Sequence, residues 1–356
     1  MRRKILFPSL FLLFHLVAVG CSDRAARTDT GAVWPDLGSR DQAVTPDQAV
    51  TPDLKPTPDL HLPPDHQPIK PDLPPPPKWN KDLTAKQPLH GVACFKGHVF
   101  AVGDKGTILH RGPKDTGFTN QTASTTAELF TVAFGEDAKG QTYGVTAGKN
   151  MAIWQTMDLG TKWAQAPQCS AYVFETFYAL HLHNYDRGLG AGVAVSGQGG
   201  GAKYYDGAVS YSWVCSNPTY KGETFYDIFS RAKRGWMVGD TKGKIYLTVD
   251  GGVTWSTTKI STNYALRGVD FPTPAVGVAV GEFGTILRST DGQGKTWTAV
   301  KAPTTAHLWD VTFFNANLGW AVGDKGTILY SKDGGATWKT QSTGVTQRLE
   351  SVCFTS

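Results

Sequence analysis

The chain has 356 residues, of which 40% are hydrophobic, and it carries 40 glycines, 21 prolines and a formal net charge of +5. Residues 78–356 are long enough to bury a large hydrophobic core. The positive charge is weak and forms no stripe of lysines and arginines, which argues against a nucleic-acid-binding protein.

Residues 1–20 are predicted to be an export signal that is not part of the fold. They begin with the basic residues Arg2, Arg3 and Lys4. The apolar stretch that follows, residues 5–19, is too short for an ordinary membrane-spanning helix. We therefore expect an exported protein.

The end of this signal, Ala18-Val19-Gly20-Cys21, resembles the lipobox of bacterial lipoproteins, although Ala18 stands where leucine is more usual. The resemblance implies cleavage before Cys21 and lipidation of this residue, and several acyl chains together anchor a protein stably in a membrane. An ordinary secretory signal that happens to end near a cysteine is the alternative. Ser22 follows the cysteine, which by analogy favours the outer membrane if the cell has one.

Residues 21–77 are predicted to be a disordered linker between the anchor and the folded domain. The tripeptide Thr-Pro-Asp recurs at Thr45, Thr51 and Thr57, and residues 74–77 are all proline. A segment with so few aromatic residues cannot bury enough apolar surface to fold, and its prolines and aspartates keep it extended. We expect it to act as a stalk, and a ligand for a proline-recognising module is the alternative.

A unit of about 41 residues repeats through residues 78–356. The apolar anchors of the first strand in each unit are about 40 to 48 residues apart, at Val92, Val132, Leu180, Ile228, Val269, Val311 and Val352. Each unit contains four short β-rich runs, and paired glycines between the second and third runs suit tight turns. A period of this length indicates an all-β β-propeller with four-stranded blades.

The ends of the domain leave the number of blades open. Six repeats are complete, whereas the last unit has only its first strand, residues 349–354. The segment beginning at Trp79 resembles the fourth strand of a unit. Either the two ends together form a short seventh blade, or the ring has six blades and these pieces cover the seam.

Four cysteines remain in the folded domain besides Cys21, and an exported location permits disulfides. Cys94 is favoured to pair with Cys353, because these residues occupy equivalent strands of the first and last units. Cys169 would then pair with Cys215, since both follow the fourth strand of neighbouring units. Buried free thiols are the alternative.

The turn between the third and fourth strands carries the motif Ser/Thr-x-Asp-x-Gly-x-Thr-Trp, which is complete from Ser331 to Trp338. This motif matches the Asp box, or BNR repeat, of sialidases and other propellers. We expect the aspartate to accept backbone N–H bonds inside the turn and the tryptophan to pack beneath it. The residues with this structural role are Asp158, Asp250, Asp291, Asp333, Trp255, Trp297 and Trp338.

The longer cassette, in which Gly319–Gly323 and Gly326–Leu329 precede the Asp box, resembles the photosystem II assembly and stability factor family. The resemblance covers residues 79–356 and is strongest in the last three units. It implies a non-catalytic propeller that binds other proteins during assembly of a complex. The few arginines of this domain are scattered, unlike the arginine-rich patch of the family, so we carry over the fold and the binding role but no partner.

No catalytic, cofactor or metal site is identified in the sequence. The run Gly197–Gly201 lacks the Gly-Lys-Ser/Thr of a phosphate loop, and His181 and His183 share a strand face without a third metal ligand. The Arg-Ile-Pro motif of sialidases is absent as well. A glycan-binding or sialidase-like glycoside hydrolase propeller nevertheless remains the alternative function.

The sequence therefore predicts a membrane-anchored, exported, non-catalytic propeller that binds a protein partner in an assembly or scaffold role. The second and third units have the longest spacings and carry the aromatic stretches Tyr172–Tyr178 and Tyr220–Tyr226. Aromatic residues on irregular loops often anchor interfaces, so these units are favoured for binding. Packing between blades is the other explanation for these side chains.

Overall fold

The structure is a computed structural model of the chain. It describes residues 16–21, 79, 85–136, 140–150, 152–166, 176–183, 191–196, 202–206, 212–215, 223–241, 243–251 and 254–355. The predicted linker beyond Cys21 lies outside these residues. None of the helices in the described part of the chain has the length and apolar character needed to span a bilayer.

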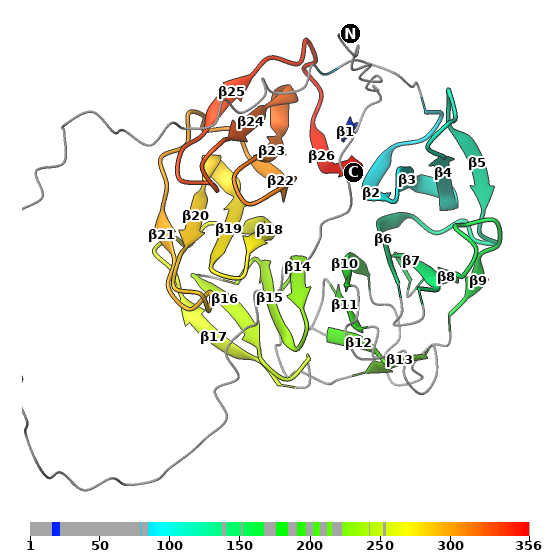
Figure 1. Cartoon of the computed structure of the whole chain (residues 1–356), viewed down its shortest axis with the longest axis horizontal. Coiled ribbons are helices and arrows are strands. Elements are labelled where there is room, and N and C mark those ends of the chain that lie inside the picture. The colour runs from blue at the N-terminus through cyan, green and yellow to red at the C-terminus, as the bar shows by residue number, and fades with distance from the viewer. Residues whose placement is uncertain are drawn as a thin grey trace, which may run out of the picture. The chain divides into compact units, whose positions relative to one another are not determined.

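Four-stranded antiparallel sheets make up most of the described chain, and neighbouring strands in each sheet follow one another in sequence (Figure 1). The first two sheets contain β2 (Leu89–Phe95), β3 (His98–Gly103), β4 (Thr107–Arg111) and β5 (Thr119–Thr122), then β6 (Leu129–Glu136), β7 (Thr142–Gly148), β8 (Ile153–Thr156) and β9 (Ala164–Gln165). The next two contain β10 (Phe177–His183), β11 (Ala191–Ser196), β12 (Ala202–Asp206) and β13 (Ser212–Cys215), then β14 (Phe225–Arg231), β15 (Arg234–Gly239), β16 (Lys244–Thr248) and β17 (Ser256–Lys259). The last two contain β18 (Leu266–Thr273), β19 (Val276–Gly281), β20 (Ile286–Ser289) and β21 (Thr298–Ala299), then β22 (Leu308–Phe313), β23 (Gly319–Gly323), β24 (Ile328–Ser331) and β25 (Lys339–Gln341).

The prediction of an all-β propeller with four-stranded antiparallel blades is confirmed. Strands and side chains together are described for five complete blades, which is fewer than the six complete repeats expected. The difference lies in the third unit, whose strands β10–β13 pair as a sheet but whose side chains from β11 onward lie outside the described residues. The total number of blades stays a prediction.

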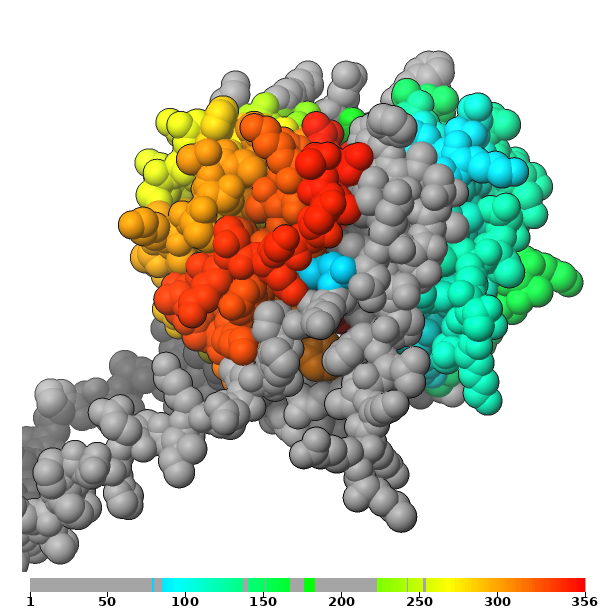
Figure 2. Space-filling model, turned by 90° about the horizontal axis from the view of Figure 1, so that it is seen from above, coloured from blue at the N-terminus to red at the C-terminus, as the bar shows by residue number. Residues whose placement is uncertain are grey.

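The first strand of every sheet lies innermost in the ring, and the fourth strand lies at its rim (Figure 1). The innermost strands β2, β6, β10, β14, β18 and β22 contact one another in chain order, and β26 (Leu349–Thr355) closes the circle by contacting both β22 and β2. In the space-filling view, the orange and red blades from the end of the chain lie on the opposite side from the cyan and green first blades (Figure 2). The ring therefore closes between β22 and β2.

The closure is held by a covalent bond. Cys94 of β2 and Cys353 of β26 form a disulfide with Cα atoms 5.6 Å apart, across a sequence separation of 259 residues. In the uncleaved chain β26 also pairs in parallel with β1 (Leu16–Cys21), with Val19 opposite Cys353 and Cys21 opposite Thr355. The predicted cleavage before Cys21 would remove this pairing and leave the disulfide. Trp79 lies edge-on to Phe354 of β26, with ring centroids 6.1 Å apart. The first and last parts of the domain thus meet at β26.

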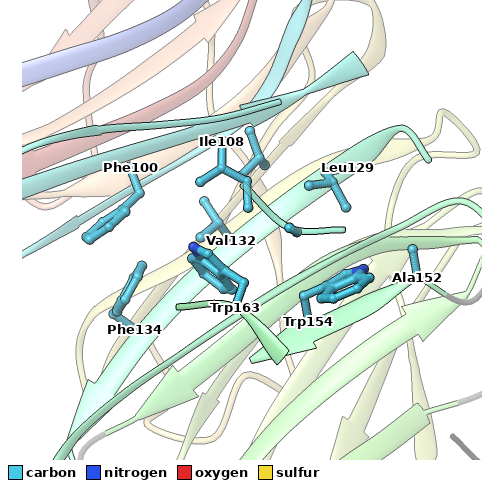
Figure 3. Packing of buried hydrophobic residues seen from close by; sticks show 10 residues of the cluster. Phe100, Ile108, Leu129, Val132, Phe134, Ala152, Trp154 and Trp163 are labelled. Atoms are coloured by element: carbon cyan, nitrogen blue, oxygen red, sulfur yellow. The ribbon is translucent and has the colours of Figure 1, made fainter. Parts of the chain in front are cut away.

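Apolar side chains fill the space between neighbouring blades. Between the first two blades, Phe100 stacks on Phe134 with centroids 4.0 Å apart, and Trp163 meets Phe134 edge-on (Figure 3). Ile108 and Leu129, both fully buried, lie in the same cluster. The bulky residues belong to the predicted strands, and the alternation of buried positions directs them into these layers.

The turns between the second and third strands explain the recurring glycine pairs. The 3-10 turns η1 (Asp104–Gly106), η2 (Glu282–Gly284) and η3 (Asp324–Gly326) each place their central residue in the left-handed region, with φ between 54° and 57°. The glycine that follows also has positive φ, and a Cβ on Gly106 would lie 2.1 Å from the Thr125 carbonyl oxygen. Glycine is therefore required at the end of this turn.

Buried carboxyl groups connect innermost strands of consecutive blades. Oδ2 of Asp227 accepts the Val269 N–H at 2.7 Å, and Oδ2 of Asp270 accepts the Phe313 N–H at 2.6 Å. In the same way, Oδ2 of Asp310 accepts the N–H of Val352 and the hydroxyl of Ser351, both at 2.8 Å. The three aspartates thus join β14 to β18, β18 to β22 and β22 to β26.

Two of these aspartates make the stability of the fold dependent on pH. Burial raises the pKa of Asp310 to about 7, against the opposing effect of its hydrogen bonds, and burial and the nearby Asp310 raise the pKa of Asp227 well above its usual value. Between pH 4 and 7 the folded chain therefore binds more protons at these sites than the unfolded chain, so the free energy of unfolding falls as the pH rises through this range. Parts of both residues stay exposed, so we expect the free energy of unfolding to fall by only about 1 kcal/mol over this pH range.

The measurement is urea unfolding of the wild type and of Asp310→Asn at pH 5 and pH 8. The wild type should be the more stable at pH 5, and the variant should show a smaller difference between the two pH values. Equal differences in the two proteins would show that Asp310 does not titrate in this range.

Candidate functional site

Seven side chains form a closed ring at the start of the innermost strands. Each is the second residue of its strand and follows a buried leucine or phenylalanine. These residues, which we call the inner ring, are His90, Phe130, Tyr178, Tyr226, Arg267, Trp309 and Glu350. All seven are half-buried, so the ring presents part of each side chain to solvent.

Aromatic contacts make up one half of the inner ring. The His90 imidazole lies 5.1 Å from the Phe130 ring, Phe130 lies 5.3 Å from Tyr178, and Tyr178 lies 5.8 Å from Tyr226 (centroid distances). Burial raises the pKa of Tyr226 above its usual value, although Arg267 opposes this effect. The four residues therefore form a continuous arc of aromatic rings along blades one to four.

On the other half, Arg267 of the inner ring and the adjoining Arg348 lie over aromatic rings. The Arg267 guanidinium lies 3.8 Å from the Tyr226 ring centroid and 4.7 Å from that of Trp309, and the Arg348 guanidinium lies 4.3 Å from the Trp309 ring centroid. Such cation–π stacking holds the planar guanidinium groups in place. Trp309 is therefore the aromatic residue that both arginines contact.

Carboxylates compensate the charge of these arginines. Nη2 of Arg267 donates to Glu282 at 2.7 Å, and Nε of Arg348 donates to Asp324 at 2.9 Å. The Trp309 indole N–H also donates to Asp324, at 2.8 Å. Nε of Arg267 is enclosed and has no hydrogen-bond partner among the described residues.

His90 closes the ring between two acids. Its Nδ1 lies 3.0 Å from Glu350 and its Nε2 lies 2.7 Å from Asp104. Burial lowers the pKa of His90, but the hydrogen bonds and charges of Glu350 and Asp104 outweigh this effect and raise the pKa above its usual value. Because both nitrogens face carboxylates, the imidazolium form is favoured, and it fixes β2 to β26 and to the turn η1.

The inner ring has the chemistry of a binding surface. It offers aromatic faces, stacked guanidinium groups and carboxylates, and these groups are held by contacts with one another. Among the described residues, no group of three or more His, Cys, Asp or Glu side chains is placed to hold a metal ion.

The Asp-box residues lie in their turns and away from the inner ring. Asp333 accepts the Thr337 N–H at 2.9 Å and the Ser331 hydroxyl at 2.8 Å, and the Trp338 indole donates to the Gly335 carbonyl. Burial opposes ionisation of Asp291, but the Thr296 hydroxyl and four backbone N–H groups that donate to its carboxylate outweigh this effect and lower its pKa to about 2. The remaining members of the set make similar local contacts or pack in the adjoining clusters: Asp158, Asp250, Trp255 and Trp297.

Of the other residues that the sequence analysis singled out, some lie in the described part of the chain and some outside it. Nδ1 of His181 contacts the Ser230 hydroxyl at 3.1 Å on the neighbouring strand, so it serves packing between blades. The side chains of Cys21, His183 and Cys215 lie outside the described residues, as do the whole of Cys169 and of Gly197–Gly201. The pairing of Cys169 with Cys215 and the lipidation of Cys21 therefore stay predictions.

Sequence reasoning reached only part of the inner ring. Tyr178 and Tyr226 end the two aromatic stretches that were favoured for binding, although they lie in strands and not on loops. His90, Phe130, Arg267, Trp309 and Glu350 were missed. The available signal was positional, because each follows the first leucine or phenylalanine of its unit.

Comparison with known proteins confirms the predicted resemblance. Residues 208–302 and 293–356 match the family model of photosynthesis system II assembly factor YCF48. No curated protein matches the chain. The family match covers the last part of the domain, where the repeat is strongest.

Several solved structures share the fold. YCF48 from Cyanidioschyzon merolae superposes with a TM-score of 0.58 at 13% identity, covering 75% of this chain and 88% of its own. YCF48 bound to D1 peptide has a TM-score of 0.52 at 22% identity, and the match covers 70% of this chain and 80% of that one. A catalytically inactive virginiamycin B lyase from Staphylococcus aureus with quinupristin has a TM-score of 0.61 at 16% identity, and the match covers 77% of this chain and 91% of the lyase. At these identities the likeness shows the propeller fold alone.

Proposed function

We propose that this chain is a non-catalytic, envelope-anchored propeller that binds a segment of a partner protein at the inner ring. The observation that carries the proposal is the closed set of contacts that runs from His90 to Trp309 and returns through Arg348 and Glu350. Aromatic residues and arginine are the residue types that dominate the energetics of protein interfaces. Their half-buried, mutually fixed side chains lose little conformational entropy when a partner binds.

The comparisons support a protein partner over a small-molecule substrate. The matched family model describes an assembly factor, and one related structure contains a bound D1 peptide. The ionisable groups of the inner ring are engaged with one another, as His90 is with Glu350 and Arg267 is with Glu282. This pairing suits recognition, whereas acid–base catalysis needs a group within reach of a substrate proton.

An exported location is supported by the Cys94–Cys353 disulfide, because structural disulfides persist mainly in oxidising compartments. The basic and apolar start of the chain and the lipobox-like Ala18–Cys21 indicate how it would be exported and anchored. The propeller would then bind its partner at the cell envelope.

Replacing Cys21 with Ser is expected to release the protein from membranes. Without the thiol no acyl chain can be attached, and the described part of the chain offers no membrane-spanning helix in its place. The measurement is immunoblotting of the membrane and soluble fractions after cell lysis. An unchanged share of the protein in the membrane fraction would contradict the lipid anchor.

The binding role is tested with peptides selected on the purified protein from a random library displayed on phage. Selected peptides should compete with one another for one site and should bind poorly once Trp309 is replaced. Failure to select any peptide that depends on the inner ring would overturn the proposed function.

A further inference from the structure

An exposed aromatic group lies beside the inner ring on the fifth blade. Tyr264 and Phe283 are 52% and 55% exposed, and their rings lie 4.8 Å apart. The His307 ring lies 4.7 Å from Phe283 on its other side. We call these three residues the aromatic ledge. Two large exposed aromatic rings in contact with each other differ from the scattered apolar residues of an ordinary surface.

Phe283 stands where two equivalent turns carry lysine. Lys105 in η1 and Lys325 in η3 have the same left-handed backbone conformation, with φ of 55° and 57° against 54° for Phe283. Both lysines are exposed, as a charged side chain at a turn should be. An exposed phenylalanine ring is not stabilised by hydration as a lysine ammonium group is, and bulky residues rarely adopt positive φ. The fold therefore does not require this side chain, which points to a role in binding.

The aromatic ledge continues the inner ring. Glu282, the residue before Phe283, holds Arg267 of the ring, and the Glu282 N–H donates to the Ala265 carbonyl, next to Tyr264. The His307 carbonyl accepts the Asp324 N–H, and Asp324 holds Trp309 and Arg348. A bound segment that contacts Trp309 could therefore reach the ledge directly.

The charges around the ledge select the kind of segment that fits. Glu282 and Asp324 are engaged with Arg267 and Arg348, whereas Lys325 makes no ion pair with any described residue. Lys325 follows Asp324 directly, and the Asp324 N–H donates to the His307 carbonyl, so the backbone of Lys325 lies at the His307 end of the ledge and its side chain is exposed. A carboxylate is its complement.

We propose that the aromatic ledge anchors a partner-protein segment in which an aromatic or branched aliphatic side chain stands next to an aspartate or glutamate. The apolar side chain packs on Phe283 and Tyr264, and the carboxylate pairs with Lys325. This inference rests on the proposed function, because it names the residue types that the partner brings to the edge of the inner ring.

The test compares fluorescence polarisation of one selected, labelled peptide with the wild type and three variants. Phe283→Lys should weaken binding about tenfold, as the loss of an interface anchor does. It should leave the fold intact, because lysine already occupies the same conformation at Lys105 and Lys325. Lys325→Glu should weaken binding of a peptide that carries the aspartate or glutamate. It should weaken binding less when that residue of the peptide is replaced by asparagine or glutamine. Lys105→Phe, which places phenylalanine in the equivalent turn of the first blade, should leave affinity unchanged.

The outcomes separate this inference from the proposed function. If Phe283→Lys binds as tightly as wild type while Trp309→Ala does not, the ledge is no anchor and the inner ring remains the site. If neither variant loses affinity, both proposals fail. If sedimentation shows that wild type forms a dimer that Phe283→Lys dissociates, the ledge binds a second copy and the inference is overturned.

Discussion

The double substitution Cys94→Ala with Cys353→Ala is expected to lower the free energy of unfolding by about 5 kcal/mol. The disulfide closes a loop across 259 residues, so it removes a large part of the conformational freedom of the unfolded chain. It also joins β2 to β26, the strands at which the ring closes, where Cys353 is buried and Asp310 supplies the adjoining hydrogen bonds. The measurement is the midpoint of guanidinium unfolding at equilibrium.

Reduced wild type is the matched control for this variant. Added reductant should lower the wild-type midpoint by more than that of the double variant, in which only the predicted Cys169–Cys215 disulfide is left to reduce. A double variant that unfolds at the wild-type denaturant concentration would show that hydrogen bonds and packing alone close the ring.

Trp309→Ala is expected to weaken binding of a selected peptide about a hundredfold. Trp309 stacks against both Arg267 and Arg348 and donates to Asp324, so its loss removes the central anchor and an aromatic contact of each guanidinium group. Trp309→Phe keeps an aromatic face but loses the indole N–H, and it should retain part of the affinity. The measurement is fluorescence polarisation with the labelled peptide.

A matched control for this variant is Tyr330→Ala. Tyr330 is a half-buried aromatic residue on β24 of the same blade, but it pairs with Trp320 and Lys339 and takes no part in the inner ring. Its replacement should leave peptide affinity unchanged. Equal losses in Trp309→Ala and Tyr330→Ala would indicate damage to the blade instead of loss of a binding surface.

Much of the fold was predictable because its determinants are local. The turn Gly323–Gly326 and the Asp box from Ser331 to Trp338 specify their own conformations through positive φ angles and short-range hydrogen bonds. Such motifs repeat along the chain with the blades, so the period showed four-stranded units. The equivalence of the strands around Cys94 and Cys353 likewise needed only the period.

The inner ring could not be read from local pattern because its seven residues differ in type. His90, Arg267 and Trp309 share no side-chain chemistry, and only closure of the ring brings these positions together. The buried aspartates were missed for a related reason. Asp227 lies in the middle of a strand, and an isolated aspartate at such a position is ordinarily expected to be solvent-exposed. Its hydrogen-bond partner is the backbone N–H of Val269 in another blade.

The aromatic stretches of the irregular units led to a partly different site. Tyr178 and Tyr226 were expected on projecting loops, yet they belong to the inner ring and contact each other. The regular units contribute the other ring residues, so the proposed binding surface is not confined to the irregular units of the repeat. We infer that the partner contacts several blades at once.

The most direct measurement of the central claim is a titration of one selected peptide against wild type, Trp309→Ala, Trp309→Phe and Tyr330→Ala, with folding of each checked by circular dichroism. If the inner ring is the binding surface, Trp309→Ala should lose most of the peptide affinity and Trp309→Phe should lose part of it. Tyr330→Ala should bind the peptide as tightly as wild type. Wild-type affinity in a folded Trp309→Ala protein would contradict this claim.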